Sequence, residues 1–244
     1  MKDRLVAHRG DMATYPENSL LALCAAAKLG FKYIELDIQL SKDNLPIVIH
    51  DDNLVRTTGI NKSVYESSSE YLLTQRVLTP LKDKESQSLL NLTTLERTVE
   101  VLNSYPDITL FVEIKRQCLE HLSVESVVEV VLKNLVKAKF NIVVISFVRQ
   151  VVEHAKKQGN YPVGWVLTDY DQEQLKIVNT MQPNYIFCNV KKINRPSELW
   201  KGSWKWVLYD IMNPSFAYEL LEQGVDLIET GDIVKLNASE YFSE

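Results

Sequence analysis

Short apolar runs rich in Val, Ile and Tyr alternate along the chain with longer segments whose apolar residues recur at helical spacing. This alternation is typical of a parallel sheet covered by helices. The predicted strands are 5–8, 33–40, 47–50, 109–115, 142–147, 162–167, 185–189, 205–209 and 226–229. Helical segments between them include NSLLALCAAAKLG, TTLERTVEVLNS, VESVVEVVLKNLVKA and PSFAYELLEQG. The pattern therefore predicts an α/β fold.

One connection is too short for this scheme. The segment SKDNLP joins the second and third strands, whereas a parallel crossover needs about a dozen residues. These two strands are therefore expected to form an antiparallel hairpin, and a two-residue turn at Asp43 and Asn44 would place His50 beside Asp37. The eight other strands match the count of a closed (β/α)₈ TIM barrel, distorted by the hairpin.

The segment after the third strand has weak periodicity. Residues 51–92 are rich in Ser and Thr and far longer than a usual connection. We interpret them as a small lid inserted into the barrel. The length of 244 residues suits one such barrel, so residues 1–244 are predicted to form a single domain.

Composition and charge narrow the class of protein. The chain is 45% hydrophobic and 24% charged, which favours a compact fold over disorder. Its net charge of -5 provides no general attraction to nucleic acid or anionic lipid, so we expect neither as a partner. Any anionic ligand must be held by a local site.

Cysteine use and the N-terminal segment indicate a cytoplasmic location. Cys24, Cys118 and Cys188 are far apart and lack CxxC spacing, so we expect reduced, mostly buried thiols. MKDRLVAHRG reaches a predicted strand too soon for a signal peptide, and no apolar run is long enough to span a membrane.

Polar residues follow or interrupt the apolar runs of four neighbouring strands. In a TIM barrel such strand ends carry the catalytic groups. They are His8, Arg9, Glu35, Asp37, His50, Glu113 and Lys115. Glu35 and Asp37 are two residues apart, as are Glu113 and Lys115, so each pair points to one face of its strand.

Three carboxylates on that face cannot all ionise without compensation, because like charges at short range oppose one another. A hard divalent cation resolves this conflict. Oxygen ligands alone favour Mg²⁺ or Ca²⁺ over zinc. His121 and His154 lie in helical segments and are interpreted as surface residues. Two histidines, two basic residues and three carboxylates at neighbouring strand ends are not explained by packing, since buried charges are costly unless paired or metal-bound.

VAHRG, PENS, YIELDIQLSKDNLPIVIHDDNLVRTTG and FVEIK together resemble the glycerophosphodiester phosphodiesterase family. The likeness is dense over residues 5–59, returns at LTTLERTVEVL and FVEIK, and continues through ISF and GVDLIET. It implies a TIM barrel with a small insertion after the HD motif. It also implies metal-dependent cleavage of small-molecule glycerophosphodiesters to glycerol 3-phosphate and an alcohol.

The resemblance also implies roles for individual residues. His8 and His50 would be acid and base in either order, Arg9 and Lys115 would bind phosphate, and three carboxylates would hold Mg²⁺ or Ca²⁺: Glu35, Asp37 and Glu113. Trp206 is expected to contact substrate. Glu17 is given a secondary part in substrate binding, either by orienting Arg9 or by favouring the helix N-terminus electrostatically.

The sequence departs from the family at several positions. PENS stands where PENT is usual, which leaves Asn18 or Ser19 able to cap the next helix. The ending GVDLIETGD differs from GVDGIITD at Glu229 and Gly231, and Tyr209 follows Trp206 where smaller polar residues are common. Two alternatives stay open: a barrel that binds phosphodiesters without cleaving them, and a lysophospholipid hydrolase using apolar residues of SVYESSSEYLLTQRVL.

Overall fold

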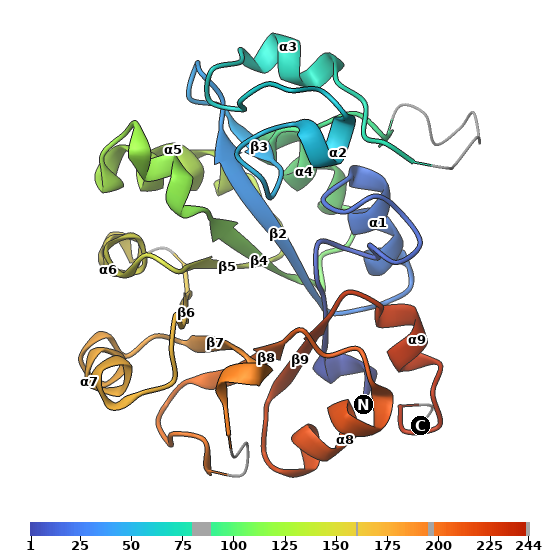
Figure 1. Cartoon of the computed structure of the whole chain (residues 1–244), viewed down its shortest axis with the longest axis vertical. Coiled ribbons are helices and arrows are strands. Elements are labelled where there is room, and N and C mark those ends of the chain that lie inside the picture. The colour runs from blue at the N-terminus through green and yellow to red at the C-terminus, as the bar shows by residue number, and fades with distance from the viewer. Residues whose placement is uncertain (80–88, 160, 195–197, 243–244) are drawn as a thin grey trace.

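The computed structural model describes residues 1–79, 89–159, 161–194 and 198–242, and Figure 1 shows their arrangement. Within these ranges the strands form one nine-stranded sheet in the order β1-β9-β8-β7-β6-β5-β4-β2-β3. The sheet closes because β1 pairs in parallel with both β2 and β9. The barrel strands are β1 (Leu5–Ala7), β2 (Tyr33–Leu40), β4 (Thr109–Ile114), β5 (Asn141–Ser146), β6 (Val163–Val166), β7 (Tyr185–Asn189), β8 (Lys205–Tyr209) and β9 (Leu227–Thr230). The predicted distorted TIM barrel is confirmed.

Helices surround the barrel and follow its strands in chain order. They are α1 (Leu20–Lys28), α4 (Leu95–Leu102), α5 (Val124–Leu135), α6 (Arg149–Gln158), α7 (Gln172–Met181), α8 (Pro214–Glu222) and α9 (Ile233–Asn237), with short 3₁₀ turns at Lys2–Arg4, Arg116–Glu120 and Val190–Lys192. Several begin at a residue whose side chain accepts a backbone N–H. Ser19 caps α1 and Thr94 caps α4 in this way, which satisfies one of the free donors of a helix start.

Two apolar layers hold the barrel together. Side chains that point outward from the strands pack beneath the helices and form the larger core. Those that point inward fill the barrel: Val6, Phe111, Val143, Ile145, Val166, Phe187, Val207 and Leu227. Strand residues alternate between the two faces. The inward positions that follow these apolar residues therefore lie at the C-terminal mouth of the barrel.

The hairpin of β2 and β3 (Pro46–Val48) exists, but its predicted register is wrong by one residue. Leu40 pairs with Pro46 and Ile38 with Val48, because the loop has three residues, 42–44, rather than two. Ser41 N–H donates to Leu45 O (3.0 Å), and Asn44 takes a left-handed φ of 60° that this loop type requires. His50 therefore follows the end of β3 instead of pairing with Asp37.

The insertion after β3 carries α2 (Val55–Thr58) and α3 (Ser69–Thr74), which lie at the top of Figure 1. Its apolar residues share a small core with β3, made of Ile47, Ile49, Leu54, Val64, Leu72 and Leu92. Residues 80–88 of the predicted lid lie outside the described residues. The insertion thus packs onto the barrel at the hairpin.

The three cysteines are free thiols, and Cys118 and Cys188 are buried, as predicted. In the parts of the chain that the structure describes, no helix is both long and apolar enough to cross a membrane.

Candidate active site

One pocket opens at the C-terminal mouth of the barrel, and six of the predicted site residues line it. Its lining is His8, Arg9, Glu35, His50, Glu113, Lys115, Ile145, Phe147, Val166, Phe187, Tyr209, Asp210 and Glu229. Asp37 lies beside it, 1% exposed, in contact with Arg9 and Lys115. The predicted cluster of His, basic and acidic side chains is therefore assembled at one place.

The segment His8-Arg9-Gly10 forms a tight turn between β1 and α1. His8 N–H donates to Thr230 O (3.1 Å), which extends the pairing with β9. Gly10 has a φ of 80°, and a Cβ there would lie 2.5 Å from the carbonyl carbon of Ala22, so only glycine fits. Arg9 also has a positive φ, 53°, and its N–H donates to Glu35 Oε2 (3.0 Å). The turn holds His8 and Arg9 over the barrel axis.

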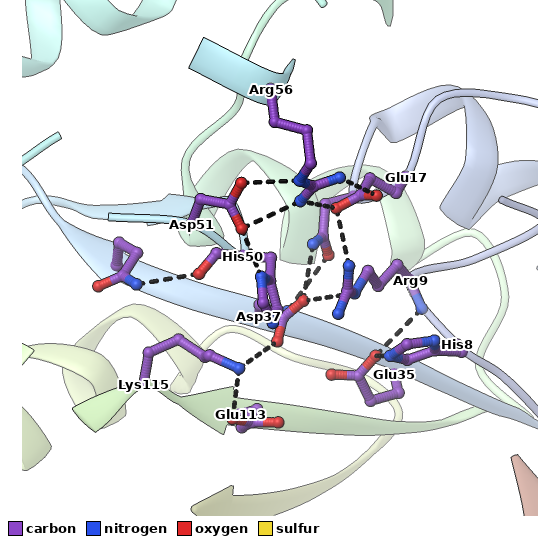
Figure 2. A network of polar contacts seen from close by, with 12 residues as sticks. His8, Arg9, Glu17, Glu35, Asp37, His50, Asp51, Arg56, Glu113 and Lys115 are labelled. Carbon is purple, nitrogen blue, oxygen red and sulfur yellow. Dashed lines mark hydrogen bonds and ion pairs between the residues drawn. The ribbon is translucent and has the colours of Figure 1, made fainter. Parts of the chain in front are cut away.

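Asp37 is the centre of the charged network in Figure 2. Its carboxylate lies 3.0 Å from Arg9 Nε and 3.2 Å from Lys115 Nζ. Asn18, which has a left-handed φ of 57°, donates from Nδ2 to Asp37 Oδ2 (2.9 Å). Burial alone would raise the pKa of Asp37, but Lys115 and Arg9 outweigh it and hold that pKa below its ordinary value.

A second set of contacts joins His50 to Arg9 through the insertion (Figure 2). His50 Nδ1 lies 2.6 Å from Asp51 Oδ1. Arg56, from α2, donates to Asp51 Oδ2 (2.7 Å) and to Glu17 Oε2 (2.7 Å). Glu17 in turn accepts from Arg9 Nη1 (2.9 Å). The hydrogen bond from Arg56, with a smaller effect of His50, lowers the pKa of Asp51 to about 2, against the effect of burial.

Glu35, Asp37 and Glu113 offer one oxygen each within 4.8 Å of one another. Burial and the neighbouring carboxylates raise the pKa of Glu113 to about 7, with Asp37 the largest of these charges. The same two causes raise the pKa of Glu35 well above its ordinary value. Glu35 Oε1 is buried and has no hydrogen-bond partner among the described residues. Crowded, buried and under-coordinated oxygens fit a divalent cation.

The model of the glycerophosphoryl diester phosphodiesterase family matches residues 8–235 of this chain. The chain belongs to this family. A glycerophosphodiester phosphodiesterase from Bacillus altitudinis is 36% identical over 136 residues, which is 50% of this chain and 54% of that protein. One from Caldanaerobacter subterraneus subsp. tengcongensis is 49% identical over 59 residues, or 24% of each chain. These alignments thus span a quarter to about half of the relatives' lengths.

Solved structures share the fold. A phosphodiesterase from Oleispira antarctica, in complex with its product sn-glycerol-3-phosphate, superposes with a TM-score of 0.87 at 22% identity and covers 99% of this chain and 97% of its own. A glycerophosphoryl diester phosphodiesterase from Silicibacter pomeroyi, described as putative, gives 0.82 at 16% identity, with 96% and 91% covered. The barrel of this family member is therefore that of its structural neighbours.

One predicted substrate contact is not at the pocket. Trp206 points outward from β8, 4% exposed, and belongs to the core beneath the helices. Its Nε1–H donates to Trp200 O (2.9 Å), and its ring lies 5.8 Å from that of Trp200. The prediction for Trp206 is wrong because Val207 and Tyr209 occupy the inward positions of this strand. Glu17, the other residue expected to have a secondary part in substrate binding, forms an ion pair with Arg9. This contact is the one that a role in orienting Arg9 requires.

Several residues of this family member's site were not in the predicted set. Glu229 on β9 is 5% exposed and faces His8, and the two-residue alternation that selects Glu35 would also have selected Glu229. Of the two candidate caps, Ser19 is the helix cap, whereas Asn18 binds Asp37. Arg56 has no local signal, because its partner Glu17 lies 39 positions away.

Proposed function

We propose that this chain hydrolyses glycerophosphodiesters to glycerol 3-phosphate and an alcohol, with a divalent cation and two histidines. The observation that carries the proposal is the placing of His8 and His50 in one pocket with a buried triad of carboxylates and two basic side chains. The product bound to the Oleispira antarctica phosphodiesterase, sn-glycerol-3-phosphate, supports this substrate class.

The residues that would hold the cation are Glu35, Asp37 and Glu113. All three are buried, their oxygens lie within one coordination shell, and no sulfur or nitrogen ligand is needed. This donor set favours Mg²⁺ or Ca²⁺. When bound, the cation would neutralise negative charge that develops on the phosphoryl oxygens.

Arg9 and Lys115 are the phosphate ligands. Lys115 Nζ contacts Asp37 (3.2 Å) and Glu113 (2.8 Å), which leaves one of its three donors for a phosphate oxygen. Arg9 contacts Asp37 through Nε and Glu17 through Nη1, which leaves the N–H groups of Nη2 as donors for a phosphate oxygen. Both side chains are held by carboxylates before substrate arrives, which reduces the entropy lost on binding.

His50 is the base. Asp51 is ionised because its pKa is lowered to about 2, so it can only accept a hydrogen bond, and the proton of neutral His50 must sit on Nδ1. The other ring nitrogen, Nε2, is then free to take a proton from the attacking hydroxyl. That hydroxyl is either the neighbouring glycerol hydroxyl or water.

His8 is the acid. Burial, with a smaller effect of Arg9, lowers its pKa to about 4 in the free pocket. An anionic phosphodiester beside the ring would favour the protonated form. A donor of low intrinsic pKa then passes its proton readily to the departing alkoxide, whose alcohol is otherwise a poor leaving group.

The lysophospholipid alternative has less support. In the segment SVYESSSEYLLTQRVL, Val64, Leu72 and Val77 are buried and Leu78 is exposed, and Val64 and Leu72 pack with β3. The apolar residues Ile145, Phe147, Val166 and Phe187 line the pocket itself, opposite the charged side chains. A polar head group such as choline or ethanolamine is therefore the favoured alcohol. The cytoplasmic location stays a prediction.

The test is an assay of the purified chain with glycerophosphocholine, glycerophosphoethanolamine and lysophosphatidylcholine, each with Mg²⁺, Ca²⁺ or a chelator. We expect cation-dependent release of glycerol 3-phosphate from the first two substrates and little turnover of the third. Binding of glycerophosphocholine without release of product, at every cation tested, would favour the non-catalytic barrel.

A further inference from the structure

Glu229 is a buried carboxylate of the pocket that has no part in the proposed chemistry. It lies on β9 and is 5% exposed. Its Oε1 lies 3.7 Å from Nε2 of His8, another lining residue, and this distance is too long for a hydrogen bond. Its Oε2 is buried and has no hydrogen-bond partner within the described ranges. A donor supplied by a ligand would offset the cost of burying such a carboxylate.

The place of Glu229 beside His8 puts it next to the leaving alcohol. This step rests on the proposed function, in which His8 gives its proton to the departing oxygen. The donor nitrogen of a hydrogen bond lies about 2.9 Å from the oxygen that accepts it. Because Glu229 Oε1 lies 3.7 Å from His8 Nε2, a group two carbons away from the leaving oxygen is within reach of Glu229.

The charges around Glu229 favour a cationic group at this position. The permanent cations of the pocket lining are Arg9 and Lys115, and both are assigned to the phosphate. Burial, followed by the charges of Glu113 and Asp37, raises the pKa of Glu229 to about 8. A divalent cation bound to those two carboxylates would compensate their charges, and an ammonium group would favour the ionised form of Glu229.

The wall of the pocket on β6, β7 and β8 suits a short alcohol. Val166, Phe187 and Tyr209 line it, followed by Asp210 at the rim. The carboxylate of Asp210 already accepts a hydrogen bond from Asn189 Nδ2 (2.7 Å). None of these lining residues is basic, so this side of the pocket can pack against methylene groups and does not favour an acidic head group.

We propose that Glu229 selects the head group of the substrate by accepting a hydrogen bond from the primary ammonium of a short amino alcohol such as ethanolamine. A primary ammonium has N–H donors, whereas the quaternary nitrogen of choline has none. A site built around a hydrogen bond rejects an analogue that lacks the donor more strongly than an apolar pocket rejects an added methyl group. This ranking deepens the proposed function, which accepts both head groups.

The test compares three glycerophosphodiesters, whose alcohols are ethanolamine, choline and propanol, in which a methyl group replaces the ammonium. The kcat/KM of the purified chain is measured with the cation that supports turnover. We expect the wild type to prefer the ethanolamine diester by at least ~10-fold over each of the others, because hydrogen bonds between charged groups are strong. Glu229→Gln, which removes the charge with little change of shape, should reduce this preference to less than ~3-fold, mainly by losing activity on the ethanolamine diester.

Glu153→Gln is the matched control, because it removes a carboxylate from an exposed ion pair with Arg149 on α6. It should keep the preference of the wild type. If Glu229→Gln does not fold, the comparison of the ethanolamine and propyl diesters in the wild type still tests the proposal, since it needs no variant.

Equal kcat/KM for the three diesters in the wild type would overturn the inference and leave the proposed function standing. So would a loss in Glu229→Gln by the same factor on all three, because a residue that only orients His8 would give that pattern. If no diester is cleaved, the proposed function fails and calorimetry decides the inference. Tighter binding of the ethanolamine diester than of the choline diester, lost in Glu229→Gln, would support it, and equal binding of the two would contradict it.

Discussion

The mouth of the barrel has two halves of different chemistry. The charged half comes from β1, β2, β4 and the loop after β3, and it consists of His8, Arg9, Glu35, Asp37, His50, Glu113 and Lys115. The apolar half comes from β5 to β8 and consists of Ile145, Phe147, Val166, Phe187 and Tyr209, with Asp210 following β8 at its rim. In both halves the residues lie on the inward face of the strands or in the segments that directly follow them, so the barrel geometry alone does not cause the difference. The side chains do.

The comparison shows how one pocket can keep many charges in a dry place. In the charged half each basic group is bound by carboxylates, and Asp37 is ionised because Lys115 and Arg9 compensate its burial. The apolar half carries no such cost and lowers the local dielectric constant, which strengthens the electrostatic interactions opposite it. Glu229 lies on β9, where the two halves meet, without a basic partner.

Loss of a cation ligand should have the largest effect on activity. Such a loss would show that the reaction depends on the charged half of the pocket. Glu35→Gln, Asp37→Asn and Glu113→Gln each remove an anionic ligand with little change of shape. We expect each to weaken cation binding and to lower kcat by at least ~10²-fold, measured by calorimetry and by glycerol 3-phosphate release. Unchanged cation affinity in all three variants would contradict the assignment.

Arg56 tests whether the insertion supports the charged half. Arg56→Gln removes the link between Asp51 and Glu17, so His50 and Arg9 lose their shared support. We expect kcat to fall by ~10-fold to ~100-fold, a range typical of groups that orient catalytic ligands. Arg97→Gln, which breaks an exposed pair with Glu100, is the control and should leave kcat unchanged. Equal kinetics in the two variants would remove Arg56 from the site.

The apolar half should affect which substrate is preferred and leave the chemistry intact. Val166→Ala widens the pocket, and we expect it to shift the ratio of kcat/KM between choline and ethanolamine diesters by less than ~10-fold, or less than ~1.4 kcal/mol, because both diesters lose the same apolar contact. Val163→Ala, on the same strand but facing the helices, should not change the ratio. A loss of cation affinity in Val166→Ala would contradict the division into halves.

The pH dependence of stability should report the uncompensated carboxylates. Burial and nearby carboxylates raise the pKa of Glu229 to about 8 and that of Glu113 to about 7. The unfolded chain ionises at lower pH, so the stability that these protonated groups contribute is lost as pH rises through 7 and 8. The pKa of His8 is lowered to about 4. It therefore reduces the free energy of unfolding only below pH ~6.5, where the unfolded histidine binds a proton and the folded one does not.

We therefore expect the Tm of chelator-treated protein to fall by at least ~2 °C between pH 6.5 and 8.5. The fall should be smaller in Glu229→Gln and in wild-type protein with Mg²⁺ or Ca²⁺. Differential scanning calorimetry measures both comparisons. A Tm that rises over this interval in the metal-free wild type would show that these carboxylates are already ionised at neutral pH.

Much of the fold could be predicted from the sequence because strand and helix periodicities differ and the connections have characteristic lengths. The short SKDNLP segment was enough to identify the hairpin. Its register was not predictable to one residue, because Asn44 can adopt the left-handed conformation either in a two-residue turn or at the end of a three-residue loop. The error moved the predicted position of His50 relative to Asp37.

The site was predictable where its residues follow strand alternation, as Glu35, Asp37 and Glu113 do. Trp206 shows the limit of transferring a role by likeness: alternation along β8 places it on the outer face. Arg56 shows another limit. It reaches Glu17 only because the insertion packs on β3 through its own apolar core, and no local pattern contains that contact.

The division of labour between His8 and His50 is the central claim about the charged half, and substrate reactivity tests it most directly. His8→Ala and His50→Ala should each lower kcat on glycerophosphocholine by ~10²-fold to ~10⁴-fold, the usual range for general acid–base catalysis. On a diester with a p-nitrophenolate leaving group, which needs no proton, His8→Ala should recover most of its activity and His50→Ala should not. Equal losses for both variants on both substrates would contradict the assignment of acid and base.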